Sequence, residues 1–214
     1  MIQMAMSFLL KKMRIENKEF VTSDDLIEYC KPMELKYNAV IRYFIKKGYL
    51  LRIFRGIFYV KPLEELELGR SKYSYLELVA KGLELKKVKN WYFGLHTALK
   101  LNNMTHEHFT IDEVVNDTIF RAKPMKIAGY NFKFIKLSPS LLNFGIIKRN
   151  GIRHSDLEKT ILDFIYIWRY NGIPEDKIVI DVSEWAKDTS KSKLGKYANN
   201  YPTTVSRIAK RAVE

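Results

Sequence analysis

The stretch from residue 49 to residue 60 constrains the fold of this chain more than any other. Two apolar runs rich in β-branched and aromatic side chains, 49–54 and 57–60, are separated only by Arg55-Gly56. Glycine readily adopts the positive φ that a two-residue connection needs at its second position. The pattern therefore predicts a β-hairpin that carries Arg52 on its first strand and Arg55 at its tip.

An amphipathic helix is expected before this hairpin, over residues 35–47. At about 100° per residue, one arc of the helix is apolar and consists of Tyr37, Val40, Ile41, Phe44 and Ile45. The opposite arc has the side-chain types that a helix in the major groove of DNA uses. We predict that six residues there contact DNA: Lys36, Asn38, Ala39, Arg42, Tyr43 and Lys46. An exposed helix face is usually polar in any case, so this helix alone does not distinguish a DNA-binding face from an ordinary solvated one.

Two further helices are predicted upstream. The first covers residues 1–17, and the second begins after Thr22 or Ser23, whose side-chain oxygen can cap it. Pro32 ends the second helix. Helix, helix, turn, helix and hairpin is the order of a winged helix-turn-helix, in which the third helix enters the major groove and the hairpin follows the backbone or the minor groove. Residues 1–66 are therefore predicted to form a DNA-binding domain.

The charge of the chain agrees with a polyanionic partner. Thirty-seven Lys and Arg against 24 Asp and Glu give a net charge of +13, which attracts nucleic acid over a distance. Between residues 31 and 61, Glu34 is the one acidic residue among eight basic ones. Double-stranded DNA is the predicted partner, and a generally basic, highly charged protein is the alternative.

The remaining residues, 67–214, are predicted to form a second domain, after an acidic connector at 62–70. Helices are expected at 73–86 and within 90–101, and strands at 108–115, 117–123, 125–127, 132–137 and 146–147. The sequence Ser155-Asp156-Leu157-Glu158 is typical of a capping box at the start of a helix that ends at Gly172. The predicted fold class is α+β: an N-terminal winged helix-turn-helix followed by a mixed α/β domain with a small sheet and C-terminal helices.

The tail, residues 189–211, is basic and contains no Asp or Glu. Two short helices are expected there. They carry the residues of a predicted surface for DNA or a partner: Lys191, Lys193, Lys196, Arg207, Lys210 and Arg211. A solvated exterior explains these charges equally well.

Three segments, in order along the chain, resemble the AbiEi family, the regulators and antitoxins of type IV abortive-infection systems. Residues 48–62 resemble the family's Arg-Gly wing, residues 90–101 its Thr-Ala-Leu helix, and residues 152–163 its Ser-capped helix with Glu, Thr and Asp. The chain departs from the family in its long first helix and its basic tail. The resemblance implies binding to inverted repeats upstream of the protein's own operon. It also implies a second domain that opposes a nucleotidyltransferase-like toxin, functionally if not by contact.

Catalytic, metal and cofactor sites are not predicted. His96 has no spaced acidic partner and is interpreted as a hydrogen-bonded helix residue, while His106 and His108 lack a third metal ligand. The sequence contains neither a Gly-rich phosphate-binding loop nor the Gly-x-Ser-x-Gly nucleophile elbow of hydrolases, so we do not expect an enzyme. Two alternatives stay open: a second domain that senses a small molecule, and a metal-dependent nuclease built on Asp112, Glu113 and a nearby Lys.

A cytoplasmic protein without a membrane partner is expected. The single cysteine, Cys30, can form no internal disulfide and offers no zinc cluster. No window approaches the roughly 20 apolar residues of a membrane-spanning helix. Lys11 and Lys12 follow the apolar start of the chain, whereas a secretory signal places its charges first.

Overall fold

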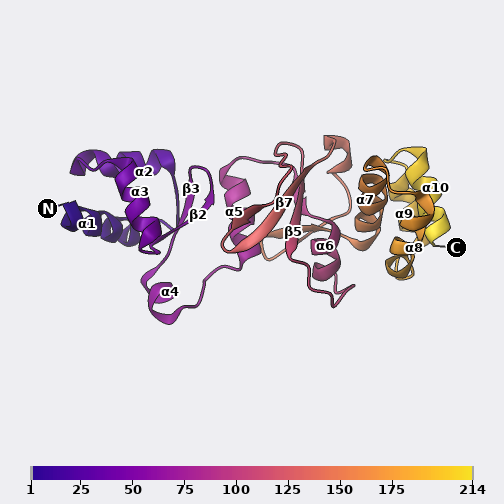
Figure 1. Cartoon of the computed structure of the whole chain (residues 1–214), viewed down its shortest axis with the longest axis horizontal. Coiled ribbons are helices and arrows are strands. Elements are labelled where there is room, and N and C mark those ends of the chain that lie inside the picture. The colour runs from indigo at the N-terminus through magenta and orange to yellow at the C-terminus, as the bar shows by residue number, and fades with distance from the viewer. Residues whose placement is uncertain (1, 214) are drawn as a thin grey trace. The chain divides into compact units, whose positions relative to one another are not determined.

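The computed structural model describes residues 2–213, and for Ile2 it describes the backbone only. These residues form helices and two separate sheets, which confirms the predicted α+β class (Figure 1). The chain divides into two compact units, which we call the N-terminal unit (residues 1–87 with 127–129) and the C-terminal unit (residues 88–126 with 130–214).

The N-terminal unit combines helices with a three-stranded antiparallel sheet of order β1-β3-β2. Its elements are α1 (Ile2–Ile15), β1 (Phe20–Thr22), α2 (Ser23–Cys30), the 3-10 turn η1 (Lys31–Met33), α3 (Tyr37–Lys46), β2 (Leu50–Phe54), β3 (Ile57–Val60), α4 (Leu63–Leu68) and α5 (Tyr75–Leu85). The hairpin predicted at Arg55-Gly56 and the helix predicted over 35–47 are both confirmed. Gly56 has a φ of +78°, as the turn requires.

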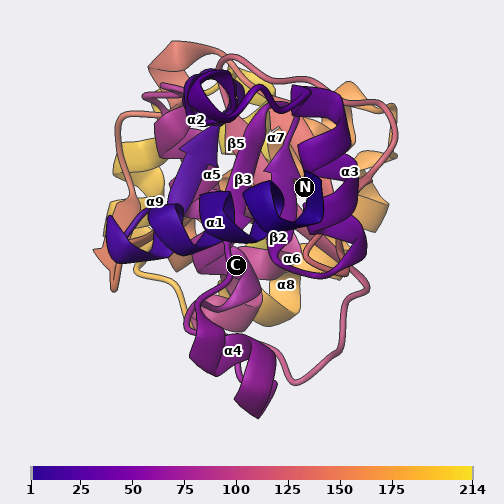
Figure 2. The same ribbon diagram turned by 90° about the vertical axis from the view of Figure 1, so that its left-hand side faces the viewer.

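The core of this unit lies between α1, α2, α3 and the sheet. Figure 2 shows α1 crossing in front of the strands, and its fully buried Leu9 and Met13 pack with Val40 and Phe44 of α3 and with Phe58 of β3. Apolar burial of this kind, at roughly 25 cal/mol per Å², is the main source of stability. It also fixes the orientation of α3 against the hairpin.

Thr22 caps α2. Its hydroxyl accepts a hydrogen bond from the Asp25 backbone N–H at 3.2 Å, and the Asp25 carboxylate accepts one from the Thr22 N–H at 2.7 Å. This reciprocal capping box satisfies backbone donors that the first helical turn leaves without a partner. Of the two predicted caps, Thr22 is therefore the one used.

We expect Thr22→Ala to cost about 1 kcal/mol, because the cap side chain is lost while the donors remain. Native-state hydrogen exchange of the α2 amides measures this loss. Ser7→Ala is a matched control, since Ser7 is exposed on α1, and we expect it to change the same amides by less than about 0.5 kcal/mol. Equal protection in the two variants would contradict the role of Thr22.

The N-terminal unit extends past the boundary predicted between residues 66 and 67. The Tyr59 hydroxyl donates to the buried carboxylate of Glu65 in α4 at 2.6 Å. Further on, α5 approaches β2 so closely that a Cβ on Gly82 would lie 2.6 Å from Ile53 Cγ2 and 2.7 Å from the Phe54 ring. The acidic connector and the helix after it therefore belong to the first compact unit.

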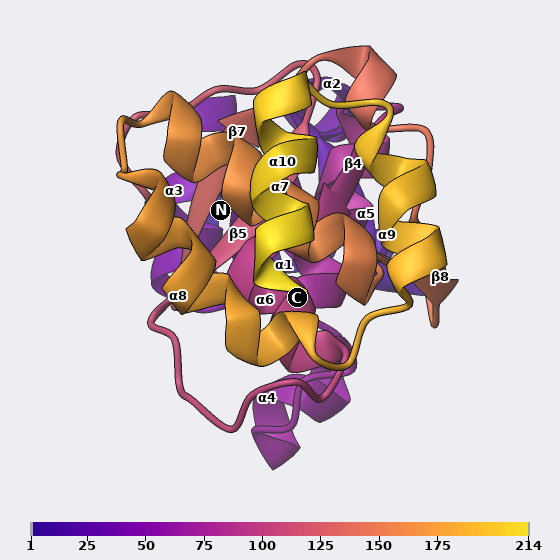
Figure 3. The same cartoon turned by 90° about the vertical axis from the view of Figure 1, so that its right-hand side faces the viewer.

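The C-terminal unit is built on a six-stranded mixed sheet of order β6-β7-β5-β4-β9-β8. The parallel pairs are β4 with β9 and β5 with β7. Figure 3 shows α10 in front of α7, with α8 and α9 on either side. The elements are β4 (Trp91–Phe93), α6 (Leu95–Leu101), β5 (Ile111–Asn116), β6 (Met125–Ile127), β7 (Tyr130–Lys136), the 3-10 turn η2 (Pro139–Leu141), β8 (Ile146–Arg149), β9 (Ile152–Ser155), α7 (Leu157–Tyr170), α8 (Glu175–Ala186), α9 (Lys191–Ala198) and α10 (Thr203–Ala212).

Two local predictions for this unit are wrong. Residues 117–123 form a loop, because the buried Asn116 side chain accepts from the Thr118 N–H at 2.9 Å and donates to the Ile119 carbonyl at 3.0 Å, which turns the chain away from the sheet. The cap of α7 is Asp156, which accepts from the Lys159 N–H at 2.9 Å. Ser155 is instead the last residue of β9. The two short helices predicted for the tail are confirmed as α9 and α10.

A buried ion pair lies at the centre of the C-terminal unit. Lys159 and Asp163 of α7 have side chains that are 0% exposed, and Lys159 Nζ is 3.1 Å from Asp163 Oδ1. The hydroxyls of Tyr92 and Tyr201 each donate to the Asp163 carboxylate at 2.7 Å. Burial, followed by the charge of Asp163, raises the pKa of both tyrosines well above the ordinary value. The network connects β4, α7 and the segment before α10.

Candidate nucleic-acid interface

A groove in the N-terminal unit brings together α3 and the β2–β3 hairpin. Four of the predicted DNA-contacting residues line it: Asn38 and Arg42 from α3, and Arg52 and Arg55 from the hairpin. The remaining lining residues are Ser23, Tyr37, Ile41, Gly56 and Phe58, so no carboxylate contributes to it among the described residues. The groove has a volume of about 890 Å³, and three arginines are among its lining residues.

Ser23, the first residue of α2, holds the two walls of the groove in place. Its backbone N–H donates to the Gly56 carbonyl at 2.9 Å, and its hydroxyl lies 2.6 Å from the hydroxyl of Tyr37. A Cβ on Gly56 would lie 3.0 Å from the Ser23 hydroxyl oxygen, so a larger residue at the turn would strain this contact. The Ser23 backbone hydrogen bond therefore fixes the hairpin turn against α2, and the contact between the Ser23 and Tyr37 hydroxyls joins α2 to α3. Sequence reasoning did not assign this role to Ser23.

The arginines of the groove are oriented but not neutralised. Arg42 donates from Nε to the Asn38 carbonyl at 3.2 Å, which lays its guanidinium along the helix. The Arg52 guanidinium lies 5.6 Å from the centre of the Phe58 ring, a cation–π distance. Among the described residues, no carboxylate forms an ion pair with Arg42, Arg52 or Arg55. Their charge is available to an external anion.

The other predicted residues of α3 lie outside the groove. Lys36, the N-cap residue, and Lys46, in the last turn, are exposed at the two ends of the helix, and Ala39 is half-buried. Tyr43 is on a different side, where its ring lies 6.0 Å from Phe44 and 6.5 Å from Tyr49. Tyr43 lines a hollow next to α1 and packs against neighbouring rings, and it does not line the groove.

Ile45 is predicted to lie in the apolar arc of α3, but the structure exposes it. It is 37% exposed, because the buried stripe of α3 is completed by Val40, Ile41 and Phe44. At 100° per residue, Ile45 falls in the same arc as Asn38 and Arg42. An apolar side chain beside two hydrogen-bonding ones suits the methyl group of thymine. The helical spacing alone indicates that Ile45 lies beside the exposed Asn38 and Arg42, whereas its hydrophobicity favours the apolar arc.

The basic tail is partly neutralised within its own unit. Lys193 lies 3.0 Å from Asp156 and 2.9 Å from Glu158. Burial alone would lower the pKa of Lys193, but its hydrogen bonds to the two carboxylates outweigh that effect and raise the pKa. Burial would raise the pKa of Glu158, but the hydrogen bond from Lys193 and backbone hydrogen bonds, including that from the Ser190 N–H, outweigh this effect and lower the pKa. This cation therefore holds α9 to the start of α7.

Two more of the six predicted tail cations are paired. Arg207 lies 2.6 Å from Glu175, and Arg211 lies 2.7 Å from Asp176 at the start of α8. The predicted surface for DNA or a partner retains three exposed lysines outside these pairs: Lys191, Lys196 and Lys210. The excess charge of the tail is consequently about half of what the sequence suggests.

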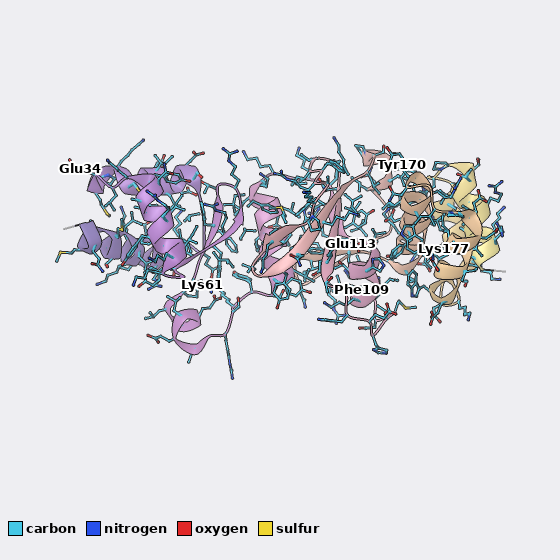
Figure 4. The ribbon with its side chains drawn as sticks, viewed as in Figure 1. Glu34, Lys61, Phe109, Glu113, Tyr170 and Lys177 are labelled. Atoms are coloured by element: carbon cyan, nitrogen blue, oxygen red, sulfur yellow. The ribbon has the colours of Figure 1, made fainter. Side chains whose placement is uncertain are left out.

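His96 of α6 has an acidic partner that the sequence did not reveal. Its Nδ1 lies 3.2 Å from Glu113 Oε2, its backbone N–H donates to the same oxygen at 3.0 Å, and its ring lies 4.4 Å from that of Phe109. Figure 4 labels Glu113 and Phe109 in this region. The interpretation of His96 as a hydrogen-bonded helix residue is confirmed. Its partner follows seventeen residues later, on β5, beyond any local signal.

Asp112 and Glu113, the carboxylates of the nuclease alternative, are both buried. Thr97 donates to Asp112 at 3.2 Å, next to the His96–Glu113 contact. Within residues 2–213, no three His, Cys, Asp or Glu side chains are grouped closely enough to hold a metal ion. His106 and His108 are exposed in the loop before β5.

Comparison with known proteins identifies a fold but no family. No family model matches the chain, and no curated protein matches it. The crystal structure of the RV2827C protein from Mycobacterium tuberculosis is similar, with a TM-score of 0.63 and 14% sequence identity over 100% of this chain and 77% of that one. The similarity covers both units and concerns the fold alone. No helix within the described part of the chain is long and apolar enough to cross a membrane.

Proposed function

We propose that this chain is a sequence-specific DNA-binding transcriptional regulator and that its N-terminal unit is a winged helix-turn-helix. The observation that carries the proposal is the groove in which Asn38 and Arg42 of α3 meet Arg52 and Arg55 of the hairpin. The order α1, α2, α3 and hairpin agrees with that class of DNA-binding domain. The absence of carboxylates among the lining residues favours an anionic ligand.

In the proposed complex, α3 enters the major groove of DNA. Asn38 suits the paired hydrogen bonds of adenine, Arg42 suits guanine, and Ile45 suits a thymine methyl group. Arg52 and Arg55 then contact phosphates or the adjoining minor groove, where negative potential favours arginine. The exposed Lys36 and Lys46, at the ends of the helix, contact phosphates and fix its register.

The biological role we propose is that of an autoregulating antitoxin. It rests on the resemblance of residues 48–62, 90–101 and 152–163 to the AbiEi family. The protein would bind inverted repeats in its own operator, in the cytoplasm, while its C-terminal unit opposes a nucleotidyltransferase-like toxin. The DNA-binding role does not depend on this second step.

Fluorescence anisotropy with the full-length chain tests the DNA-binding role. The probes are a duplex from the region upstream of the gene and a scrambled duplex of the same composition, each at two salt concentrations. A preference for the upstream duplex that persists at higher salt supports the proposal. Added salt weakens contacts to DNA phosphates alike in both duplexes, because it reduces the gain from counterion release. Equal binding to both duplexes that collapses with salt would mean that the net charge alone binds DNA.

We expect Arg42→Ala to change the sequence preference of DNA binding and Lys46→Ala to change its salt dependence. Arg42→Ala should relax the preference at one base pair, by about 1–3 kcal/mol, because a base contact is lost. Lys46→Ala should lower the affinity for all duplex sequences alike and reduce the slope of log K against log salt by about 1. Lys187→Ala, at an exposed lysine of the C-terminal unit, is the control and should change neither quantity. Wild-type preference and slope in both α3 variants would contradict the docking.

A further inference from the structure

A second groove lies entirely within the C-terminal unit, between the end of α7, the second half of β7 and the loop after β5. Its volume of about 680 Å³ is in the range of ligand sites, roughly 300–1,000 Å³. The backbone N–H of Arg121 donates to the Phe134 carbonyl at 3.3 Å, which attaches the loop to the edge of β7. Figure 4 labels Tyr170 at the end of α7.

Two aromatic rings of this groove face solvent. Phe120 is 67% exposed and Tyr170 is 85% exposed, whereas Tyr166, one turn before Tyr170, is partly buried, with its ring 5.9 Å from that of Tyr201. Tyr166 is therefore held by packing, while most of the surface of Phe120 and of Tyr170 is accessible to a ligand. Bases of nucleic acid stack on such faces whatever their sequence.

The charge of the same groove is positive. Arg121, Lys133 and Lys136 line it and are exposed, and no carboxylate lines it among the described residues. Asp117, at the start of the loop, interacts with one of these cations: burial raises its pKa, but hydrogen bonds from Thr118 and Asn90, together with the charge of Lys136, lower it overall. Asp117 offsets part of the Lys136 charge, and Arg121 and Lys133 remain available.

We propose that this groove binds a single-stranded segment of nucleic acid, with bases stacked on Phe120 and Tyr170 and phosphates held by Arg121 and Lys133. The rings favour a single strand over a duplex, because the bases of a duplex are already stacked on one another and present only their edges. The cations favour nucleic acid over an uncharged ligand. This site is separate from the duplex-binding groove of the proposed function and does not rest on it.

Anisotropy of labelled twelve-nucleotide oligo(U) and oligo(dT), with the full-length chain, tests the proposal. We expect Phe120→Ala/Tyr170→Ala to weaken binding to both strands by about 10-fold or more, since each stacked base is normally worth at least several-fold in affinity. Arg121→Ala/Lys133→Ala should reduce the salt slope by about 1.4, that is about 0.7 for each charge. Tyr130→Ala is the matched control, because Tyr130 is a half-exposed tyrosine at the start of β7 and does not line the groove; it should bind as the parent does.

Two further arms make the result decisive. In an Arg42→Ala/Arg52→Ala/Arg55→Ala background, single-strand binding should persist although duplex binding is strongly weakened, so this proposal and the proposed function fail separately. Loss of single-strand binding in that background would overturn the C-terminal site. Unchanged binding by the Phe120/Tyr170 variant would overturn it as well, as would equally tight binding of a poly-glutamate peptide, which would define a general polyanion surface.

Discussion

Asp163→Asn is expected to remove about 3–5 kcal/mol from the free energy of unfolding of the C-terminal unit, because a buried ion pair that loses one partner leaves an uncompensated charge. Lys159, with a side chain that is 0% exposed, would keep its ammonium group without an ion-pair partner among the described carboxylates. The rings of Tyr92, Phe144 and Tyr201, whose centres lie 4.6–5.5 Å from Lys159 Nζ, would compensate only part of that charge.

Urea denaturation followed by tryptophan fluorescence measures this loss selectively. All three tryptophans of the chain, Trp91, Trp168 and Trp185, belong to the C-terminal unit. The structure also provides a matched control, because Lys177 and Asp181 form a Lys–Asp pair with the same i,i+4 spacing, at 2.9 Å, on the exposed face of α8. Asp181→Asn should cost less than about 1 kcal/mol, since exposed pairs contribute little.

A double variant separates loss of charge from loss of shape. Lys159→Met/Asp163→Leu removes both charges and retains most of the volume, so it should recover much of the stability that Asp163→Asn loses. A double variant that is no more stable than the single one would indicate that the tyrosine hydroxyls, and not the ion pair, determine the cost. A loss equal to that of Asp181→Asn would contradict the burial of the pair.

Local signals predicted the parts of the fold that depend on local physics. The Arg55-Gly56 turn and the apolar stripe of α3 each involve a few neighbouring residues, and both are present in the structure. The order of the six-stranded sheet depends on parallel pairings such as β5 with β7, which no short pattern specifies. The buried Lys159 was equally unpredictable, because lysine is almost always at the surface.

The candidate interface was predictable to a similar degree. Helical spacing placed Asn38 and Arg42 on the exposed face, and the hairpin placed Arg52 and Arg55 beside them. Residues at the margins of that face were misassigned: Tyr43 packs on Tyr49, while Ile45 is exposed. Burial at a helix margin depends on which elements pack on either side, and that information is tertiary.

We expect simultaneous replacement of Arg42, Arg52 and Arg55 by Ala to lower the affinity for duplex DNA by about 10²-fold, because each arginine contributes on the order of 1 kcal/mol or more. If Arg52 and Arg55 contact phosphates, the slope of log K against log salt should fall by roughly 2, at about 0.9 for each contact, whereas the loss of the Arg42 base contact should reduce sequence preference. Anisotropy with the upstream duplex over a range of salt concentrations measures the affinity and the slope.

The control for this variant removes the same charge from the other basic surface. Lys191, Lys196 and Lys210 are exposed tail lysines, and their replacement by Ala also subtracts three positive charges from the chain. If only the overall field mattered, the two triple variants would bind DNA equally weakly. If the groove contacts DNA directly, the arginine variant should lose much of its affinity and the lysine variant less than about threefold, because exposed charges that do not contact the DNA are largely screened by salt. The opposite ranking would transfer the duplex-binding surface from α3 and the hairpin to the tail.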